Sequence, residues 1–272
     1  MMCQNEESAA ALYLARGADT ECDAKFDRFI QSYQLNAAGI AHTLYVALKG
    51  FASPDHLAAT RARFSAINPV FLNLEDNRYD VGAYIDCSKQ MAATYICFMN
   101  THAEILAPNW LNNFVAHLRR REVGLVGASG SFESLQLPGL EVELFPNPHL
   151  RTNGFALRRT VLLDLFRDYL IGSKLDAYAF ESGRSSLTRR ITARGYDVLV
   201  VGRNGRGYPP LWWPASDTFR QGRQDNLLIA DNQTRRFDDA LAPEKSMLLR
   251  LAWGSHIELA DTRPDLDACS LR

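Results

Sequence analysis

The sequence lacks any apolar run of the roughly 20 residues that a membrane-spanning helix needs. Its first residues, MMCQNEESAA, show no basic segment followed by an apolar one, so we predict no signal peptide. Charge of one sign is not in excess either, because 30 Lys and Arg face 31 Asp and Glu. Nucleic-acid binding usually needs a basic surplus. We therefore expect a cytoplasmic protein that neither spans a membrane nor binds nucleic acid.

Cysteine is scarce and irregularly placed. The five cysteines are odd in number, widely scattered, and without the paired spacing of a zinc-binding motif: Cys3, Cys22, Cys87, Cys97 and Cys269. We interpret them as reduced thiols, which suits a cytosolic protein, and predict neither a disulfide framework nor a zinc site.

What is present is an ordinary globular composition, with 47% hydrophobic and 22% charged residues among 272. This length suits one large α/β domain or two small ones. We predict a main domain over residues 1–240, followed by a C-terminal helix and tail over 241–272.

Strand and helix patterns alternate along the chain. Strands are expected at 11–15, 43–48, 70–74, 95–99, 123–127 and 197–201, and helices at 25–35, 80–91, 108–118, 161–169, 185–193 and 243–253. A further helix is expected to open at Ser53-Pro54-Asp55, with Ser53 as N-cap and Pro54 at the first helical position. Such alternation predicts an α/β fold with a mostly parallel, Rossmann-like sheet and helices on both faces. Ligands of these sheets bind beyond the carboxyl ends of the strands. We therefore looked for chemistry just after each expected strand, and expect the segments 130–151 and 203–224 to be loops.

The first candidate segment, EDNRYDVGAY, follows the third expected strand and contains Asp80 and Gly82. The N-terminus of the next helix offers unpaired N–H groups that bind anions. The alternative, that Asp80 simply caps the helix, is the more common role for such a residue.

The second segment follows the fourth expected strand, where a buried-looking run stops at Asn100 and His102. Residues two apart at the end of an extended strand point the same way, so these two side chains can share a ligand or a metal ion. An ordinary strand exit with a hydrogen-bonded histidine is an equally good interpretation.

The third segment, FESGRSSLTRRI, contains Glu181 just before an expected helix. A carboxylate in that position can act as a general base. It can also be a capping acid at a helix N-terminus, which is common.

Taken in order, these segments resemble the inverting family 2 type of glycosyltransferase with the GT-A fold. The resemblance rests on EDNRYDVGAY, YICFMNTHAEILAPNWL, VGLVGA, LRTNGFALRR and FESGRSSLTRRI, and covers roughly residues 10 to 235. The first segment also resembles a stretch of the rhamnan-synthesis branch. Two departures stand out: Asn-Thr-His occupies the place of the family's Asp-x-Asp metal motif, and Glu-Ser replaces its late Glu-Asp.

The resemblance implies a single displacement, in which an acceptor hydroxyl attacks the anomeric carbon of a nucleotide-sugar. Glu181 would be the catalytic base, and His102 would lie at a divalent cation, Mn²⁺ or Mg²⁺. Asp80, Gly82 and Asn100 would bind the nucleotide-sugar. Because His102 replaces an aspartate, we expect weaker metal dependence than in an Asp-x-Asp enzyme.

Later segments supply further candidates. The loop 203–224 would fold over the donor and bring Arg220 to it, since arginine suits diphosphate geometry, or Arg220 is an ordinary arginine of a surface loop. Trp212 and Trp213 either stack on a sugar or pack in the core. His149 and Arg151 line the acceptor side or only shape a loop.

The resemblance therefore implies a hexosyl- or deoxyhexosyltransferase of cell-surface polysaccharide synthesis. Its partners would be a nucleotide-sugar donor and a glycan or lipid-linked acceptor, which leaves peripheral membrane contact open. One alternative is an inactive GT-A-like domain that binds a nucleotide or glycan. Another is a sugar-phosphate nucleotidyltransferase, although the segment after the first expected strand, RGADT, is poor in the glycine that this class needs.

Overall fold

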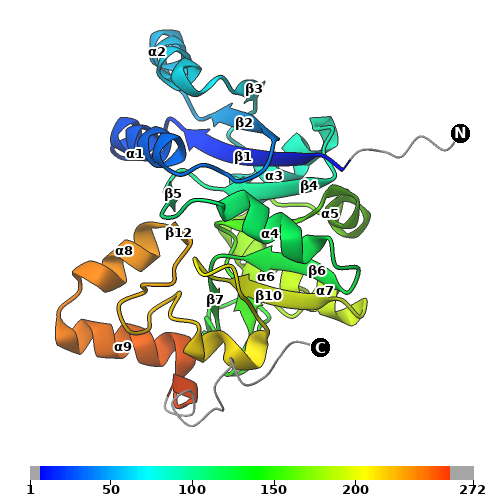
Figure 1. Ribbon diagram of the computed structural model, residues 1–272, viewed down its shortest axis with the longest axis vertical. Coiled ribbons are helices and arrows are strands. Elements are labelled where there is room, and N and C mark those ends of the chain that lie inside the picture. Colours follow the sequence, from blue (N-terminus) through cyan, green and yellow to red (C-terminus); the bar gives the residue numbers. More distant parts are fainter. Residues whose placement is uncertain (1–6, 258–272) are drawn as a thin grey trace, which may run out of the picture.

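The computed structural model describes residues 7–257 (Figure 1). Its centre is one eight-stranded sheet, made of β1 (Ala9–Arg16), β2 (His42–Lys49), β3 (Val70–Asn73), β4 (Tyr95–Met99), β6 (Val123–Gly127), β9 (Phe155–Arg158), β10 (Asp197–Val201) and β11 (Gly207–Tyr208). The strand order is β11-β10-β6-β9-β4-β1-β2-β3. Strands β1, β2, β3 and β4 pair in parallel, as do β6 and β10. Strand β9 runs antiparallel between β4 and β6, and β11 antiparallel to β10.

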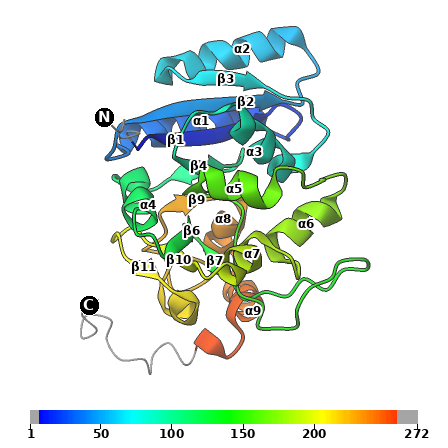
Figure 2. The ribbon, with the colours of Figure 1, turned by 90° about the vertical axis from the view of Figure 1, so that its right-hand side faces the viewer.

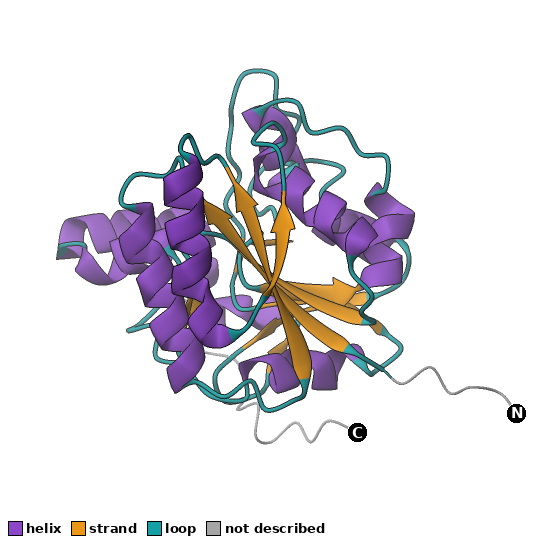
Figure 3. Ribbon diagram, turned by 90° about the horizontal axis from the view of Figure 1, so that it is seen from above, coloured by secondary structure: helices purple, strands orange, loops and turns teal. Residues whose placement is uncertain are grey.

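Helices cover both faces of this sheet (Figure 3). Along β1, Ala11 and Tyr13 belong to one apolar core, while Leu12 and Leu14 belong to the other. The first core is closed by α1 (Cys22–Leu35), α2 (Pro54–Phe64) and α4 (Trp110–Leu118). The second is closed by α3 (Tyr79–Gln90), α5 (Arg159–Phe166), α6 (Lys174–Ser182) and α7 (Leu187–Ala193). Burial on both faces explains why β1 is a continuous apolar run instead of an alternating one.

Side chains cap the starts of α2 and α6. The Ser53 hydroxyl accepts a hydrogen bond from the His56 N–H, and Pro54 occupies the first position of α2, as the sequence predicted. Helix α6 begins with a reciprocal capping box, in which Ser173 and Asp176 each bind the other's backbone N–H.

The C-terminal part packs below the sheet edge (Figures 1 and 2). It contains α8 (Asn232–Asp239) and α9 (Ala242–Trp253), whose Trp253 is fully buried and donates a hydrogen bond to the Phe219 carbonyl. The boundary predicted at 240/241 falls between these helices, although α9 contributes to the second core. The remaining elements are β5 (Glu104–Ile105) paired with β12 (Ile229–Ala230), β7 (Gly130–Ser131) paired with β8 (His149–Leu150), and the 3-10 helices η1 (Ser65–Ile67) and η2 (Pro210–Ala215).

The predicted α/β class, with a mostly parallel sheet and helices on both faces, is confirmed, and its GT-A type stays a prediction. The sequence missed β9, α6 and α8. Over residues 7–257, no helix combines the length and the apolar character needed to cross a membrane.

Candidate functional site

Two cavities open side by side along the carboxyl edge of the parallel strands. The larger pocket, about 570 Å³, is lined from the ends of β1, β3 and β4 and the starts of α3 and α6. The smaller pocket, about 290 Å³, is lined from β7, β8, the end of α6 and the segment that precedes β12. Helix α6 contributes Lys174 to the larger pocket and Glu181 to the smaller one. At a rise of 1.5 Å per residue these two positions lie about 10 Å apart along the helix.

The larger pocket contains a network of compensating charges. Asp76 lies 2.8 Å from the Arg16 guanidinium and 3.0 Å from the Lys49 ammonium, while Arg16 also pairs with Asp19 at 2.8 Å. The hydrogen bonds from Arg16 hold the pKa of Asp76 below its ordinary value. Lys49 is fully buried and also donates to the Tyr79 carbonyl, so this network ties the ends of β1, β2 and β3 together.

Asp80 lies in this pocket, in the first turn of α3. The helix is capped at Arg78 and not at Asp80, so the interpretation of Asp80 as the N-cap is wrong. Burial raises the pKa of its carboxyl group, with the nearby Lys49 charge opposing that shift. Within residues 7–257 the Asp80 carboxylate takes part in no hydrogen bond, which leaves its oxygens available to a ligand.

Gly82 has a packing role. A Cβ built at this position would lie 2.3 Å from the Cβ of Arg78, a distance that side chains do not tolerate. Arg78 in turn binds Asp86 and the Tyr169 carbonyl. Gly82 therefore lets Arg78 tie α3 to the segment after α5, and its predicted contact with a nucleotide stays a prediction.

The turn after β4 brings Asn100 and His102 together, but not as two free side chains. The side-chain oxygen of Asn100 accepts the His102 N–H at 2.9 Å, while the Asn100 N–H donates to Asn153. Asn100 thus shapes the turn, and His102 lines the larger pocket. Burial, and then the Lys25 charge, lower the pKa of His102, which favours the neutral ring.

His102 and Asp19 fit a shared divalent cation in their chemistry. The His102 Nε2 lies 3.9 Å from an Asp19 oxygen. Two ligand atoms that each lie about 2.1 Å from one ion are at most about 4.2 Å apart. A neutral imidazole and a carboxylate are the forms that bind Mn²⁺. The sequence motif offered no aspartate here, and the structure brings one from the end of β1.

Glu181 lines the smaller pocket, in the last turn of α6. The sequence placed Glu181 just before a helix start, which is wrong, because it lies inside α6, a helix that was not predicted. The alternative role as a cap at a helix N-terminus is therefore excluded, and the role as base stays a prediction. One carboxylate oxygen accepts the Thr152 N–H at 2.7 Å and the Thr152 hydroxyl. In the described part of the chain its other oxygen has no hydrogen-bond donor. The carboxylate is thus held by one oxygen and open at the other.

Two arginines form the opposite wall of the smaller pocket, stacked on the Phe219 ring at 4.3 and 4.9 Å. Arg151 pairs with the buried Asp231 at 2.6 Å. Arg220 is 5% exposed and bonds Glu133 and Gln233. The structure therefore places Arg220 with the predicted acceptor-side residues and not over the larger pocket.

His149 also lines the smaller pocket and is buried. Its Nδ1 contacts the Asn147 carbonyl at 2.8 Å. Because a carbonyl can only accept, Nδ1 carries the proton and Nε2 of the neutral ring is an acceptor. Burial lowers the pKa of His149, and the Glu181 charge opposes that shift.

The two tryptophans lie in η2. Trp213 is fully buried, packs near Phe132, and donates its indole N–H to the Tyr208 carbonyl. Its ring is not accessible to a sugar in this structure, which favours the packing role. Trp212 is half-buried against the same core.

The connection 151–154 joins the two pockets. Arg151 and Thr152 contact the smaller pocket, through Asp231 and Glu181 respectively. Asn153 binds the backbone of the Asn100 turn beside the larger pocket, and the Gly154 N–H donates to the end of β4. Four consecutive residues thus contact the surroundings of both pockets.

The sequence missed most of the charged residues of the larger pocket: Arg16, Asp19, Lys49, Asp76 and Lys174. Arg16 and Asp19 directly follow the first expected strand. They belong to the segment RGADT, whose shortage of glycine was noted but whose charged side chains were not taken as candidates.

No protein-family model and no curated protein sequence matches this chain. Among solved structures, it is similar to 4-diphosphocytidyl-2C-methyl-D-erythritol synthase from Anaerococcus prevotii, at 10% identity and TM-score 0.45 over 74% of this chain and 88% of that one. It is also similar to CMP:2-keto-3-deoxy-manno-octonic acid synthetase complexed with CTP, at 13% identity and TM-score 0.44 over 71% and 89%. Mouse xyloside xylosyltransferase 1 gives 8% identity and TM-score 0.42 over 72% and 84%. These similarities are too weak to assign the chain to a family.

Proposed function

We propose that this protein transfers a sugar from a nucleotide-sugar to a hydroxyl group of a glycan or lipid-linked acceptor, with inversion. The observation that carries the proposal is the pair of adjoining pockets at the carboxyl edge of the sheet. One pocket is rich in charged groups, and the other contains a carboxylate, Glu181, with one oxygen held and one open.

The larger pocket would bind the nucleoside diphosphate part of the donor. Arg16 and Lys174 line it and can donate to phosphate oxygens. The lining carboxylates Asp19, Asp76 and Asp80 offset these charges, together with that of the nearby Lys49. Because no positive surplus remains, a bound diphosphate needs further positive charge.

A divalent cation would supply that charge. His102 and Asp19 would hold it, for the reasons of distance and protonation given above. When bound, the ion would offset the negative charge that develops on the leaving diphosphate. We expect this help to be weaker than in an Asp-x-Asp enzyme, since His102 carries no negative charge.

The smaller pocket would bind the acceptor. The open oxygen of Glu181 would take the proton of the acceptor hydroxyl as that hydroxyl attacks the anomeric carbon. The bond from the anomeric carbon to the diphosphate breaks in the same step, and the nucleoside diphosphate leaves. Thr152 would keep the carboxylate oriented through its two hydrogen bonds. A role in cell-surface polysaccharide synthesis is consistent with such an acceptor.

A binding domain without catalysis is the alternative. It is favoured by one observation: Asp19 and Asp76, which can ligate a metal, are already paired with Arg16 and Lys49. If those ion pairs persist with ligand bound, the diphosphate gains little cationic help and turnover is not expected.

Calorimetry with UDP, GDP, dTDP and CDP, each with and without Mn²⁺, tests the proposal. One nucleotide should bind, and Lys174→Ala should weaken its binding. Glu181→Gln should leave it unchanged, because Glu181 lies in the other pocket. Release of the same nucleotide from its sugar ester, with an acceptor glycan present, then reports transfer. Absence of binding for all four nucleotides would contradict the proposal, and binding without transfer would favour the binding domain.

A further inference from the structure

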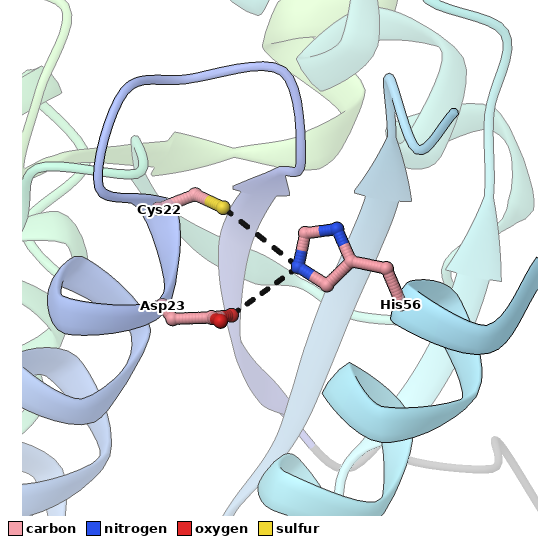
Figure 4. A group of neighbouring side chains, drawn as sticks. All are labelled: Cys22, Asp23 and His56. Atoms are coloured by element: carbon pink, nitrogen blue, oxygen red, sulfur yellow. Dashed lines mark hydrogen bonds and ion pairs between the residues drawn. The ribbon is translucent and has the colours of Figure 1, made fainter. Parts of the chain in front are cut away.

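A cluster of three metal-ligating side chains lies where the N-terminal ends of α1 and α2 meet (Figure 4). Cys22 and Asp23 come from the start of α1, and His56 from the first turn of α2. The thiol, one carboxylate oxygen and the His56 Nε2 all lie within 4.8 Å of one another. This cluster belongs to neither of the two pockets described above.

The local structure holds these groups in place. Ser53 fixes the first turn of α2 through its bond to the His56 N–H. The Phe51 ring packs edge-on against the His56 ring, with centroids 5.1 Å apart. Cys22 is 8% exposed, whereas the side chains of His56 and Asp23 are 33% and 51% exposed. The cluster therefore has a buried end and an end open to solvent.

The geometry distinguishes a metal site from a catalytic triad. In a triad, the two ring nitrogens of histidine face different partners, one the nucleophile and the other the carboxylate. Here a single nitrogen, Nε2, faces both Cys22 at 3.9 Å and Asp23 at 3.3 Å (Figure 4). Three ligand atoms that converge on one point are arranged to surround an ion.

We propose that Cys22, Asp23 and His56 bind one Zn²⁺ ion, with water completing the coordination at the solvent side. Tetrahedral zinc, with bonds of about 2.3 Å to sulfur and 2.0–2.1 Å to nitrogen and oxygen, separates nitrogen from oxygen by about 3.3 Å and sulfur from nitrogen by about 3.6 Å. The first of these matches the distance found here, and the second requires the thiol to approach by a few tenths of an ångström. A thiolate, an imidazole and a carboxylate are a donor set typical of zinc.

Binding must displace two existing interactions. The Cys22 thiol lies 3.4 Å from the Gly17 carbonyl, to which it donates, and it would release its proton to solvent as zinc binds. Asp23 also lies 3.6 Å from Arg63, but Arg63 has a closer partner in Asp27 at 2.6 Å. Asp23 can therefore turn to the ion while Arg63 remains paired.

Titration of the whole protein with Co²⁺ tests the proposal, because cobalt bound to a thiolate absorbs in the near ultraviolet. One equivalent should develop this absorption, and Zn²⁺ should abolish it by displacement. Cys22→Ser should lose the absorption. His56→Ala removes a ligand itself, so it should weaken cobalt binding by at least about 10–100-fold. That is the loss found when a residue that only orients a ligand is removed. His56 is partly exposed, so this variant tests the site even if Cys22→Ser fails to fold.

Two control variants test whether the absorption comes from this cluster. Asp55→Asn alters an exposed carboxylate in the first turn of α2 that is not part of the cluster, and it should leave cobalt binding unchanged. Cys3→Ser with Cys269→Ser removes two thiols outside the described residues and should also leave it unchanged. Absence of the absorption in the native protein would overturn the proposal. So would its persistence in Cys22→Ser, its loss in the double variant, or unaltered affinity in His56→Ala.

Discussion

The two pockets use the same residue types in opposite ways. In the larger pocket the paired side chains are partly exposed, 35% for Arg16 and 25% for Asp76. In the smaller pocket the corresponding pair is buried, 13% for Arg151 and 2% for Asp231. Exposed ion pairs contribute little to stability and are easily exchanged for other partners. Buried ones are costly to break, because the remaining charge is left without compensation.

This difference assigns different tasks to the two networks. Arg16 and Asp76 are partly exposed and can exchange each other for a charged ligand at small cost, whereas the buried Lys49 would be left unpaired if Asp76 moved away. The charged pair of the smaller pocket is fixed in place, because Arg151 stacks on the Phe219 ring and Asp231 is the N-cap of α8. The capping of α8 by Asp231, which accepts the Gln233 and Thr234 N–H groups, makes that pair part of the fold. Substitutions in the two pockets test this division.

The largest effect is expected for Glu181→Gln. If the smaller pocket carries the chemistry, loss of the general base should lower the transfer rate by about 10²–10⁴. Glutamine can still accept the Thr152 hydrogen bonds, so donor affinity should not change and the fold should persist. Rate, calorimetric donor affinity and melting temperature are measured on one preparation. A wild-type rate would show that Glu181 is not the general base and that another carboxylate takes the proton.

Next in size is the cost of Asp231→Ala. Burial alone would raise the pKa of Asp231, but the charge and hydrogen bond of Arg151 outweigh it and hold that pKa low. Removing the carboxylate leaves the buried Arg151 charge without its partner, and this should lower the free energy of unfolding by about 3–5 kcal/mol. Urea denaturation measures it. As control, Asp225→Ala breaks an exposed pair with Arg223 and should change stability by less than about 0.5 kcal/mol. Equal losses of stability in the two variants would show that the buried Arg151–Asp231 pair matters no more to the fold than an exposed ion pair does.

Arg16→Ala, unlike Asp231→Ala, is expected to have its main effect on nucleotide affinity and only a small effect on stability. Because its pairs are partly exposed, the loss of stability should be about 1 kcal/mol or less. Loss of charged hydrogen bonds to a diphosphate costs about 1.5–3 kcal/mol, or roughly 10–100-fold in nucleotide affinity. Calorimetry and urea denaturation measure the two quantities. Arg120→Ala, which breaks a surface pair with Glu122, is the control and should change neither. A large stability loss for Arg16→Ala would show that the larger network is structural too.

The sequence predicted the sheet better than the site, for physical reasons. Strands such as β1 and β4 are buried on both faces, so their apolar runs identify them without tertiary information. Strand β9 has only four residues, and α6 buries only Phe180 and Ser182, so neither gave a clear periodic signal. Missing α6 also misplaced Glu181 at a helix start. Arg220 was misplaced because only its contacts with Glu133 and Gln233, remote in sequence, bring it to the smaller pocket.

The proposed zinc site of Cys22, Asp23 and His56 likewise could not be predicted from the sequence. The cysteines have no metal-site spacing, and the sequence therefore predicted no zinc site. The ligands come from α1 and α2, and Cys22 and His56 are 34 residues apart in the sequence. The two helices meet only because β1 and β2 pair in parallel. Such a convergence is visible in the structure and not in the spacing of the chain.

The smallest effect expected is a pH-dependent one, for Asp80→Asn in the larger pocket. Burial raises the pKa of Asp80 in the folded state above its unfolded value of about 3.9. The folded state therefore binds more protons than the unfolded state, and the stability that Asp80 contributes is lost as pH rises through its folded pKa. Asparagine resembles the neutral carboxyl group at every pH. The variant should thus gain stability relative to the native protein as pH rises from about 3.5 to 7, measured by urea denaturation at each pH.

Asp76→Asn is the matched control, with the opposite sign. The hydrogen bonds from Arg16 lower the pKa of Asp76, so its contribution to stability is present above the unfolded pKa and is lost as pH falls. Its replacement should cost more stability as pH rises over the same range. Two carboxylates in one pocket would then give stability differences of opposite slope. Parallel slopes would mean that burial and ion pairing do not shift the pKa values of these two groups in opposite directions.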